Sequence, residues 1–236
     1  MQKDSFQFKQ FTIRQHLCAM KVGTDGVLLG SWAKIAAHTI DVGTGTGLIA
    51  LMLAQRDSEA LIDAIEIDEN ACLQAKDNAL ASPFADRIRV FHSSLSVYAA
   101  NTEMKYDLVI SNPPYFEQSL KGPNQKRNAA RHTDSLPLED LIEKGRSLLS
   151  PTGRIALVLP ADREDHLRGV AVENQLNVIR LTRVIPKAGA HPKRILTELS
   201  ADFALHCTPD TLQIEDSPGK YSTGYIELTM NFYLNM

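Results

Sequence analysis

The fold of this chain is decided by the stretch Ile40-Asp41-Val42-Gly43-Thr44-Gly45-Thr46-Gly47-Leu48-Ile49-Ala50. Its apolar beginning predicts a buried strand, and the apolar residues that follow predict a helix that reaches about Arg56. The alternating glycines between them allow a tight turn and let backbone N–H groups approach a ligand closely. Repeated units of this kind are typical of a doubly wound, parallel α/β sheet. The alternative is a glycine-rich turn that binds no ligand.

The spacing of these glycines differs from the dinucleotide-binding fingerprint G-x-G-x-x-G. Counted from Gly43, the last glycine falls at position 47, and position 48 is Leu. Asp41 stands just before the first glycine, so the pattern is Asp-x-Gly-x-Gly-x-Gly. Leu48 therefore argues against a nicotinamide-dependent Rossmann protein, which stays the alternative from a different functional class.

A second informative motif is Asn112-Pro113-Pro114-Tyr115, which directly follows the strand-like run 106–110. The two prolines fix φ, lack N–H donors and keep the preceding residue out of the helical region. The motif is thus rigid and extended at the carboxyl end of a strand, where open α/β sheets bind ligands. The side-chain oxygen of Asn112 and the carbonyl of Pro113 can accept from a planar amino group that stacks on Tyr115. The alternative is a proline-rich turn with a buried Asn and a packed Tyr.

The run 60–68 predicts a second strand that ends in acidic residues. An ionised carboxylate at this place can accept hydrogen bonds from both vicinal hydroxyls of a ribose. Asp68 precedes a predicted helix over 69–80 and is expected to be its N-cap. Glu66 is therefore the predicted ribose ligand.

The remaining chain alternates between predicted strands and helices. Strands are predicted over 87–92, 154–159, 178–185 and 195–199, and helices over 138–150, 161–174 and 225–234. Residues 151–153 are expected to form a turn and residues 216–220 a loop. Thr24 and Asp25 begin a predicted helix that runs through Trp32; they are candidates for its N-cap and for closing over a cofactor. At 236 residues and 44% hydrophobic content, the chain is long enough for one domain with a sizeable core.

Composition excludes several classes of protein. No stretch of eighteen uninterrupted apolar residues indicates a membrane span, and the N-terminus lacks the apolar core of a signal peptide. Cys18, Cys72 and Cys207 are scattered and form no C-x-x-C pair, so neither a zinc site nor a disulfide framework is predicted. We therefore expect a cytoplasmic location, no metal, and cysteines that act as small hydrophobic residues.

The distribution of charge carries more information than its sum. The net charge of −3, from 25 basic and 28 acidic residues, does not indicate a nucleic-acid partner. However, local basic patches attract phosphate backbones, and a solvated basic face is the alternative. Three basic runs contain no acidic residue: Lys9, Arg14 and Lys21; Lys121, Lys126, Arg127 and Arg131; and Arg180, Arg183, Lys187, Lys193 and Arg194.

The two motifs together resemble those of class I S-adenosylmethionine-dependent methyltransferases that act on planar nitrogens. Stretches 8–15, 20–30, 111–117, 130–133 and 221–234 narrow the resemblance to the bacterial tRNA1(Val) (adenine(37)-N6)-methyltransferase family. The resemblance covers nearly the whole chain. It implies an α/β, Rossmann-like fold with a mostly parallel, seven-stranded, doubly wound sheet and one antiparallel strand near the C-terminus. Residues 1–236 would form one domain, in which residues 1–39 cover the cofactor and substrate and residues 40–236 form the core.

The resemblance also implies S-adenosylmethionine as cofactor, the anticodon loop of a tRNA as substrate, no metal and a monomer. The implied catalytic residues are Asn112, Pro113 and Tyr115. The implied cofactor ligands are Asp41, Gly43, Gly45, Gly47, Glu66, Ser94 and Thr24. The implied RNA contacts are Lys121, Lys126, Arg127, Arg131 and His132. One departure stands out, because the family usually has an acid after the third strand, where this chain has Ser93-Ser94.

Three alternative functions stay open at this point, and the nicotinamide-dependent Rossmann protein is the first. Methyltransferases that modify release-factor glutamine or ribosomal guanine share the Asn-Pro-Pro-Tyr motif. The glutamine enzymes carry a separate N-terminal helical domain, whereas only about forty residues precede Asp41 here. A cofactor-binding protein without catalysis is the third alternative, against which the intact Asn112 argues.

Overall fold

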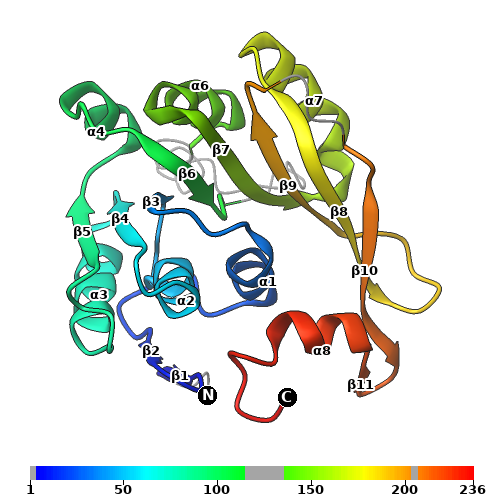
Figure 1. The fold of residues 1–236 in the computed structure, drawn as a ribbon. Coiled ribbons are helices and arrows are strands. Elements are labelled where there is room, and N and C mark those ends of the chain that lie inside the picture. The colour runs from blue at the N-terminus through cyan, green and yellow to red at the C-terminus, as the bar shows by residue number, and fades with distance from the viewer. Residues whose placement is uncertain (1–3, 115–135, 203–206) are drawn as a thin grey trace, which may run out of the picture.

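One mixed sheet forms the centre of the computed structural model, which describes residues 4–114, 136–202 and 207–236 (Figure 1). Within the described residues, nine strands follow one another across the sheet in the order β11, β10, β8, β9, β7, β6, β3, β4 and β5. Their bounds in chain order are His38–Val42 (β3), Leu61–Glu66 (β4), Ile88–His92 (β5), Tyr106–Ser111 (β6), Leu149–Pro160 (β7), Asn177–Lys187 (β8), Arg194–Ser200 (β9), Asp210–Ser217 (β10) and Lys220–Tyr221 (β11).

The strand directions confirm the predicted Rossmann-like fold. The neighbours from β7 through β6, β3 and β4 to β5 all run parallel. Strand β9 runs antiparallel to β7 and to β8, while β10 runs parallel to β8 and β11 antiparallel to β10. The prediction of seven strands with one antiparallel strand is too low, because β10 and β11 extend the sheet. The prediction missed β10 although Leu212 and Ile214 alternate with polar residues and pack against the core. The two-residue β11 is too short and exposed to give a strand signal, and 216–220 is predicted as a loop.

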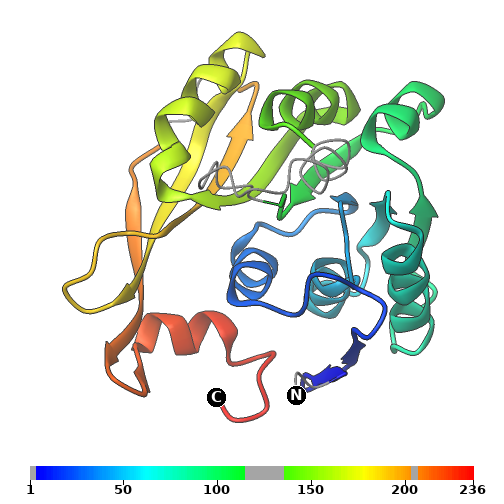
Figure 2. The ribbon, with the colours of Figure 1, turned by 180° about the vertical axis from the view of Figure 1, so that it is seen from behind.

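Helices cover both faces of this sheet (Figures 1 and 2). One layer contains α1 (Thr24–Trp32), α2 (Leu48–Arg56), α3 (Glu69–Leu80) and α8 (Thr223–Thr229). The other contains α4 (Leu95–Asn101), α6 (Leu138–Leu148) and α7 (Glu164–Glu173), which follows the short 3-10 helix Ala161–Arg163. Neighbouring strand residues enter different cores, since Leu108 and Ile110 join the cluster with α1 and α2, whereas Val109 joins the cluster with α6 and α7.

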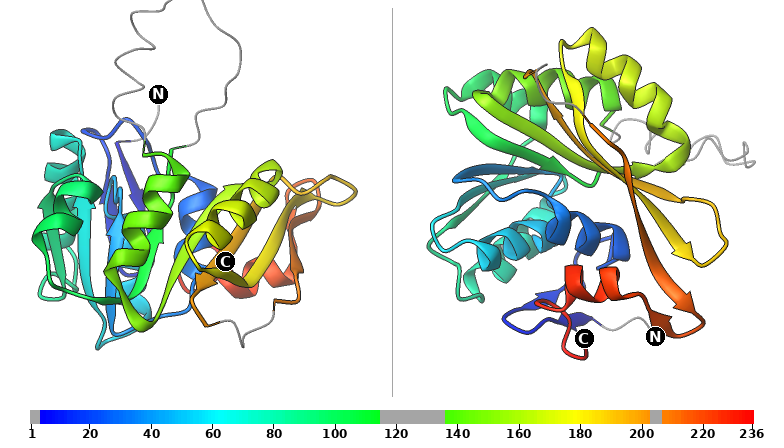
Figure 3. Two further views of the ribbon diagram at one scale, coloured as in Figure 1. Left: turned by 90° about the horizontal axis from the view of Figure 1, so that it is seen from above. Right: turned by 45° about the vertical axis from the view of Figure 1, so that its right-hand side comes forward.

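The two ends of the described chain meet on the outer side of the first helical layer. A hairpin of β1 (Ser5–Gln7) and β2 (Thr12–Arg14) lies beside the segment that follows α8 (Figure 2). The N–H of Lys9 donates to the carbonyl of Phe232 at 2.8 Å, and the rings of Phe8 and Tyr233 stack. Helix α8 packs beside α1, as the right-hand view of Figure 3 shows. The contacts of Lys9 and Phe8 with the segment after α8 therefore hold the N-terminal hairpin against the body of the molecule.

Three local predictions are corrected by the structure. Residues 151–153 belong to β7 rather than to a turn, because a bulge lets Tyr106 pair with Leu149 while Leu108 pairs with Arg154. The last helix ends at Thr229 instead of continuing to 234, although the predicted contact with the body is present. The N-cap of α1 is Gly23, with no side-chain cap, so neither Thr24 nor Asp25 caps the helix.

Among the described residues, no helix combines the length and the apolar composition that a bilayer span requires.

Candidate active site

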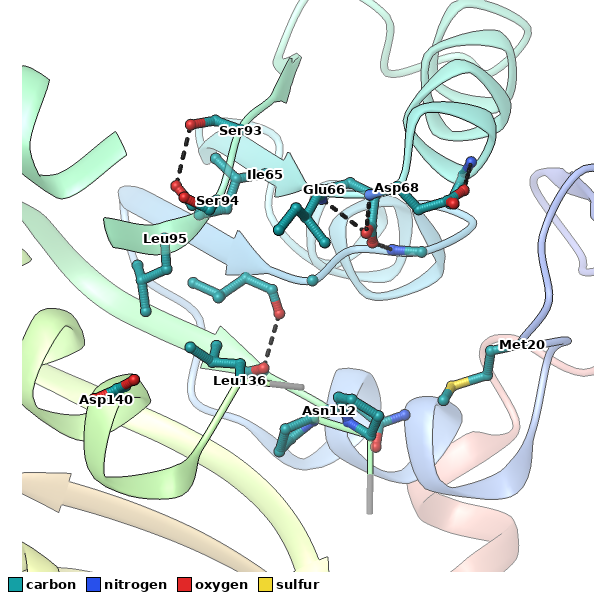
Figure 4. Close-up of a pocket in the computed structure, with 18 of the residues that line it drawn as sticks. Met20, Ile65, Glu66, Asp68, Ser93, Ser94, Leu95, Asn112, Leu136 and Asp140 are labelled. Atoms are coloured by element: carbon teal, nitrogen blue, oxygen red, sulfur yellow. Dashed lines mark hydrogen bonds between the residues drawn. The ribbon is translucent and has the colours of Figure 1, made fainter. Parts of the chain in front are cut away.

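A cavity of about 430 Å³ opens at the carboxyl ends of β3, β4, β5 and β6 (Figure 4). This is the edge of the sheet at which open α/β folds bind ligands. Six predicted site residues, from the ends of these four strands and the segments that follow them, line this cavity: Gly43, Gly45, Glu66, Ser94, Asn112 and Pro113. The structure therefore brings the two sequence motifs to one place.

The glycine loop between β3 and α2 has the backbone that its sequence predicts. Gly43, Gly45 and Gly47 have φ values of 69°, 58° and 81°, in the left-handed region that favours glycine. A Cβ atom at Gly43 or Gly45 would meet no heavy atom within 4 Å, so open space lies beside both. Gly47 does not line the cavity; it is the N-cap of α2, and its Cβ position is 3.6 Å from Ala75 of α3.

Backbone amides hold the carboxylate of Glu66 beside this loop. Its Oε2 accepts from the N–H of Gly45 at 2.8 Å, and its Oε1 accepts from the N–H groups of Ile67 and Asp68 at 2.8 and 3.0 Å. These bonds converge on the carboxylate at the cavity wall in Figure 4. Asp68 accepts from the N–H of Ala71 at 2.7 Å, which confirms it as the N-cap of α3. Glu66 is thus fixed in place, and a ribose contact by it stays a prediction.

Asp41 lies behind the glycine loop and does not reach the cavity wall. It is fully buried, and its Oδ2 accepts from the hydroxyl of Thr44 at 2.5 Å. Burial raises the pKa of Asp41 to about 7, and the negative charge of Glu66 adds to the shift, whereas the Thr44 hydrogen bond opposes it. Asp41 therefore shapes the loop from behind.

Asn112 and Pro113 form the opposite wall, directly after β6 (Figure 4). The hydroxyl of the preceding Ser111 donates to the carbonyl of Val42 at 2.8 Å, in a bond that is buried. The Cβ position of Gly26 on α1 is 3.8 Å from the amide nitrogen of Asn112, so this nitrogen faces α1. The Ser111–Val42 bond thereby joins the end of β6 to the end of β3, from which the glycine loop projects.

The other predicted site residues are distributed as follows. Ser94 lines the cavity and is also the N-cap of α4, where it accepts from the N–H of Val97 at 3.2 Å. Thr24 is the first residue of α1 and is not part of the cavity wall. Six predicted residues lie outside the described part of the chain: Tyr115, Lys121, Lys126, Arg127, Arg131 and His132.

Sequence reasoning did not single out several residues that line the cavity. Cys18, Ala19 and Met20 cover it from the N-terminal segment, and Leu136 and Asp140 bound it from the start of α6. Burial raises the pKa of Cys18 to about 11, so its thiol stays neutral, as expected for a small hydrophobic residue. Met20 lies in the stretch 20–30 that carries the family resemblance, but no motif assigns any of these residues individually to the site. Asp140 in particular has the pattern of an ordinary acid in the first turn of a helix.

The third basic run is largely neutralised by acids that are distant in sequence. Arg183 pairs with Glu164 at 2.8 Å and Arg194 pairs with Asp25 at 2.8 Å, while Arg180 lies 3.7 Å from Glu198. The interpretation of this run as unopposed charge is thus wrong for its three arginines. Lys187 and Lys193 are exposed and form no ion pair within the described residues. In the first run, Lys9 donates to the carbonyl of Met230 at 2.6 Å.

Comparison with known proteins identifies the domain, the family and the fold. The family described as methyltransferase small domain matches residues 22–168. The tRNA1(Val) (adenine(37)-N6)-methyltransferase of Parabacteroides distasonis is 52% identical over 98% of each chain, and that of Porphyromonas gingivalis strain ATCC 33277 is 49% identical over 99% of this chain and 96% of its own. A predicted O-methyltransferase from Agrobacterium tumefaciens has a similar fold, with a TM-score of 0.69 at 20% identity, over 88% of this chain and 96% of its own.

Proposed function

Because the chain belongs to the tRNA1(Val) (adenine(37)-N6)-methyltransferase family and carries the methyltransferase small domain, we propose that it methylates tRNA. The reaction is the transfer of a methyl group from S-adenosylmethionine to the exocyclic amino group of an adenine. The adenine is the one at position 37, beside the anticodon of valine tRNA. A cytoplasmic location is part of the same proposal.

One observation carries this proposal. The glycine loop after β3 and the Asn112-Pro113 pair after β6 line a single cavity, and the Ser111–Val42 hydrogen bond joins the strand ends from which they project. A loop that can cradle a cofactor therefore faces two acceptors that suit a planar amino group. Such an arrangement suits group transfer between a bound donor and the nitrogen of a base.

The cavity has the chemistry that S-adenosylmethionine requires. Open space beside Gly43 and Gly45 leaves room for the amino-acid end close to the backbone, and the Glu66 carboxylate suits the ribose hydroxyls. Apolar side chains of Ile67, Leu95 and Leu136 line the remaining wall, as an adenine ring needs. When bound, S-adenosylmethionine supplies an electrophilic methyl group on a positively charged sulfur. The family usually has an acid at the position of Ser93-Ser94. No contact among the described residues identifies a residue that takes the place of this acid. The exposed Asp140 is an acid that lines the same cavity.

Asn112 and Pro113 act on the target nitrogen. An aromatic amino group is a poor nucleophile because its lone pair is delocalised into the ring. The side-chain oxygen of Asn112 and the carbonyl oxygen of Pro113 would each accept one of its hydrogens, which draws the nitrogen towards tetrahedral geometry. Tyr115 would stack on the base and fix its angle of approach. Positioning and preorganised acceptors then provide most of the rate, and the proton leaves after the transfer.

The substrate has to bring its base out of the stack. This costs least in a single-stranded loop such as an anticodon loop. Lys187 and Lys193 flank the connection between β8 and β9, where the N–H of Ala161, just after β7, donates to the carbonyl of Lys193 at 3.1 Å. Since β8 runs in the same direction as β6 and β7, this connection is at the cavity edge of the sheet. We include both lysines in the tRNA surface.

The genetic test uses a strain that lacks this gene. Valine tRNA purified from that strain should lack N6-methyladenosine at position 37, and the wild-type gene should restore it. The gene for Asn112→Ala should not restore it, although the protein is made. An unchanged methyladenosine content in the deletion strain would contradict the proposed function.

A further inference from the structure

Helix α3 has a buried face that carries two amide side chains. Ala71, Gln74, Ala75 and Asn78 recur at intervals of three and four residues, so they share one side of the helix. Gln74 and Asn78 are 0% and 1% exposed. Buried amides have hydrogen-bond partners in nearly all proteins, because an unpaired polar group in the interior is unfavourable. The partners of these two side chains therefore show what α3 holds.

Asn78 connects two segments that are far apart in sequence. Its Oδ1 accepts from the N–H of Arg14 at 2.9 Å, and its Nδ2 donates to the carbonyl of Arg14 at 2.8 Å. The same Nδ2 donates to the carbonyl of Thr46 at 2.8 Å. Thr46 stands between Gly45 and Gly47 in the glycine loop, and the Cβ position of Gly47 is 3.6 Å from Ala75. One amide group thus fixes both the end of β2 and the glycine loop.

Residues 15–23, which we call the strap, connect β2 to α1 and cover the cavity. Gln15 closes the strap on itself, because its side-chain Oε1 accepts from the N–H of Val22 at 2.8 Å. The backbone carbonyl of Gln15 also accepts from the Lys21 ammonium group. The middle of the strap, Cys18 to Met20, lines the cavity, and Figure 4 shows Met20 among the lining residues. The strap is therefore a closed loop that begins directly after Arg14, the residue that Asn78 binds.

Gln74 provides a second contact of a different kind. Its Oε1 accepts from the N–H of Leu17 in the strap at 3.2 Å. Its Nε2 has no partner among the described residues, so Gln74 holds the strap but makes no hydrogen bond to the glycine loop. Gln74 and Asn78 are both buried amides on the same helix face. Both contact the segment from β2 to α1, but only Asn78 also donates a hydrogen bond to the glycine loop.

We propose that Asn78 is a positioning residue that couples the strap to the glycine loop, so that the lid of the cavity and the loop that holds the cofactor order together. The two Nδ2 hydrogens of one planar amide point in fixed directions. The orientation of the amide that allows it to donate to the Arg14 carbonyl therefore also determines where the Thr46 carbonyl must lie to accept the second hydrogen. Loss of the strap contact frees the amide and loosens the glycine loop, and the reverse also holds. The identity of the ligand in the cavity rests on the proposed function, whereas the coupling does not.

The coupling is tested in the ligand-free protein by hydrogen–deuterium exchange. Asn78→Asp keeps an acceptor for Arg14 and replaces the donor to Arg14 and Thr46 by an oxygen. We expect exchange to rise at least roughly tenfold in both the strap and residues 43–50, because each segment loses one hydrogen bond and the new carboxylate faces the carbonyls of Arg14 and Thr46. Gln74→Met, the matched control, removes the Leu17 contact and keeps both Asn78 bonds, so exchange should rise mainly in the strap and much less in residues 43–50. Exchange in β6 and the melting temperature show that each variant is folded; should Asn78→Asp fail this check, Asn78→Ser replaces it.

Binding of S-adenosylhomocysteine provides the functional readout by calorimetry. Asn78→Asp should raise its Kd about tenfold, as is typical of coupled sites, and Gln74→Met should raise it less than about threefold. Unchanged glycine-loop exchange in Asn78→Asp, or equal effects of the two substitutions on that loop, would overturn the coupling. Failure of the wild-type protein to bind S-adenosylhomocysteine would instead refute the proposed cofactor, and the exchange experiment would still decide the coupling.

Discussion

The hydroxyl of Ser111 donates to the carbonyl oxygen of Val42 at 2.8 Å, deep in the sheet. Each residue is the immediate neighbour of a motif, since Val42 precedes Gly43 and Ser111 precedes Asn112. The parallel pairing of β3 with β6 aligns the same two strand ends through the backbone. A donor bound at the glycine loop and an acceptor base at Asn112 would therefore meet in a geometry that the sheet determines.

The first prediction concerns the role of Asn112. Asn112→Ala removes the side-chain oxygen that we propose to accept from the target amino group. Because this contact strengthens as the nitrogen reacts, kcat should fall by roughly 10²–10³ while S-adenosylhomocysteine still binds. Steady-state methylation of tRNA and calorimetry on the same preparation measure both quantities. Retention of more than about a tenth of the wild-type rate would contradict a transition-state role.

The second prediction concerns the identity of the cofactor. S-adenosylmethionine or S-adenosylhomocysteine should raise the melting temperature, because a ligand that binds only the folded state stabilises it by mass action. NAD should cause no shift, since Leu48 replaces the third glycine of the dinucleotide fingerprint. Differential scanning fluorimetry with the three ligands at equal concentration measures this. A shift with NAD alone would refute the cofactor assignment.

The third prediction follows from the buried Asp41. Its pKa is raised from 3.8 to about 7 in the folded protein, so the folded state keeps a proton that the unfolded chain has lost. Wherever the folded state binds more protons, the free energy of unfolding decreases as pH rises. Asp41 should therefore make the protein less stable as pH increases from about 4 to about 7.

Asp41→Asn isolates this contribution, because it cannot titrate and keeps an acceptor for Thr44. Relative to the wild type, its melting temperature should increase between about pH 5 and about pH 8. Melting curves of both proteins across this range provide the comparison. Parallel curves would show that Asp41 titrates in the folded protein as it does in the unfolded chain.

The fourth prediction concerns the tRNA surface at the connection between β8 and β9. Lys187→Glu with Lys193→Glu should weaken tRNA binding without changing the Kd for S-adenosylhomocysteine. If each lysine contacts one phosphate, the slope of log K against log salt should become shallower by about 2. Binding titrations over a range of salt concentrations measure affinity and slope together.

The matched control reverses two exposed lysines at the opposite edge of the sheet. Lys34 and Lys105 precede β3 and β6, so they lie at the amino ends of these strands. Lys34→Glu with Lys105→Glu makes the same change in net charge and should leave the salt slope unchanged. Equal losses in the two double variants would indicate an effect of total charge alone. The same titration with Lys126→Glu and Arg127→Glu tests the sequence-based prediction for residues outside the described part of the chain.

The sequence predicted features that depend on contacts between neighbouring residues, and it failed for several features that depend on contacts between residues far apart in sequence. The glycine loop, the N-cap Asp68 and helix α2 depend on neighbouring residues, and their patterns predicted them correctly. The pairing of Arg183 with Glu164 and of Arg194 with Asp25 depends on tertiary contacts, so an apparently unopposed basic run is mostly neutral in space. The strap also depends on tertiary contacts, because α3 binds Arg14 and Leu17 and so helps to hold Cys18 and Met20 at the cavity.

The central claim is tested most directly by mapping the methylated position in one purified tRNA. Unmodified valine tRNA is incubated with the protein and isotopically labelled S-adenosylmethionine, and the digested product is analysed by mass spectrometry. A second valine tRNA with guanine in place of adenine 37 serves as the control. We expect labelled N6-methyladenosine at position 37 of the first tRNA and no label in the second. Label at another nucleotide, or equal label in both tRNAs, would contradict it.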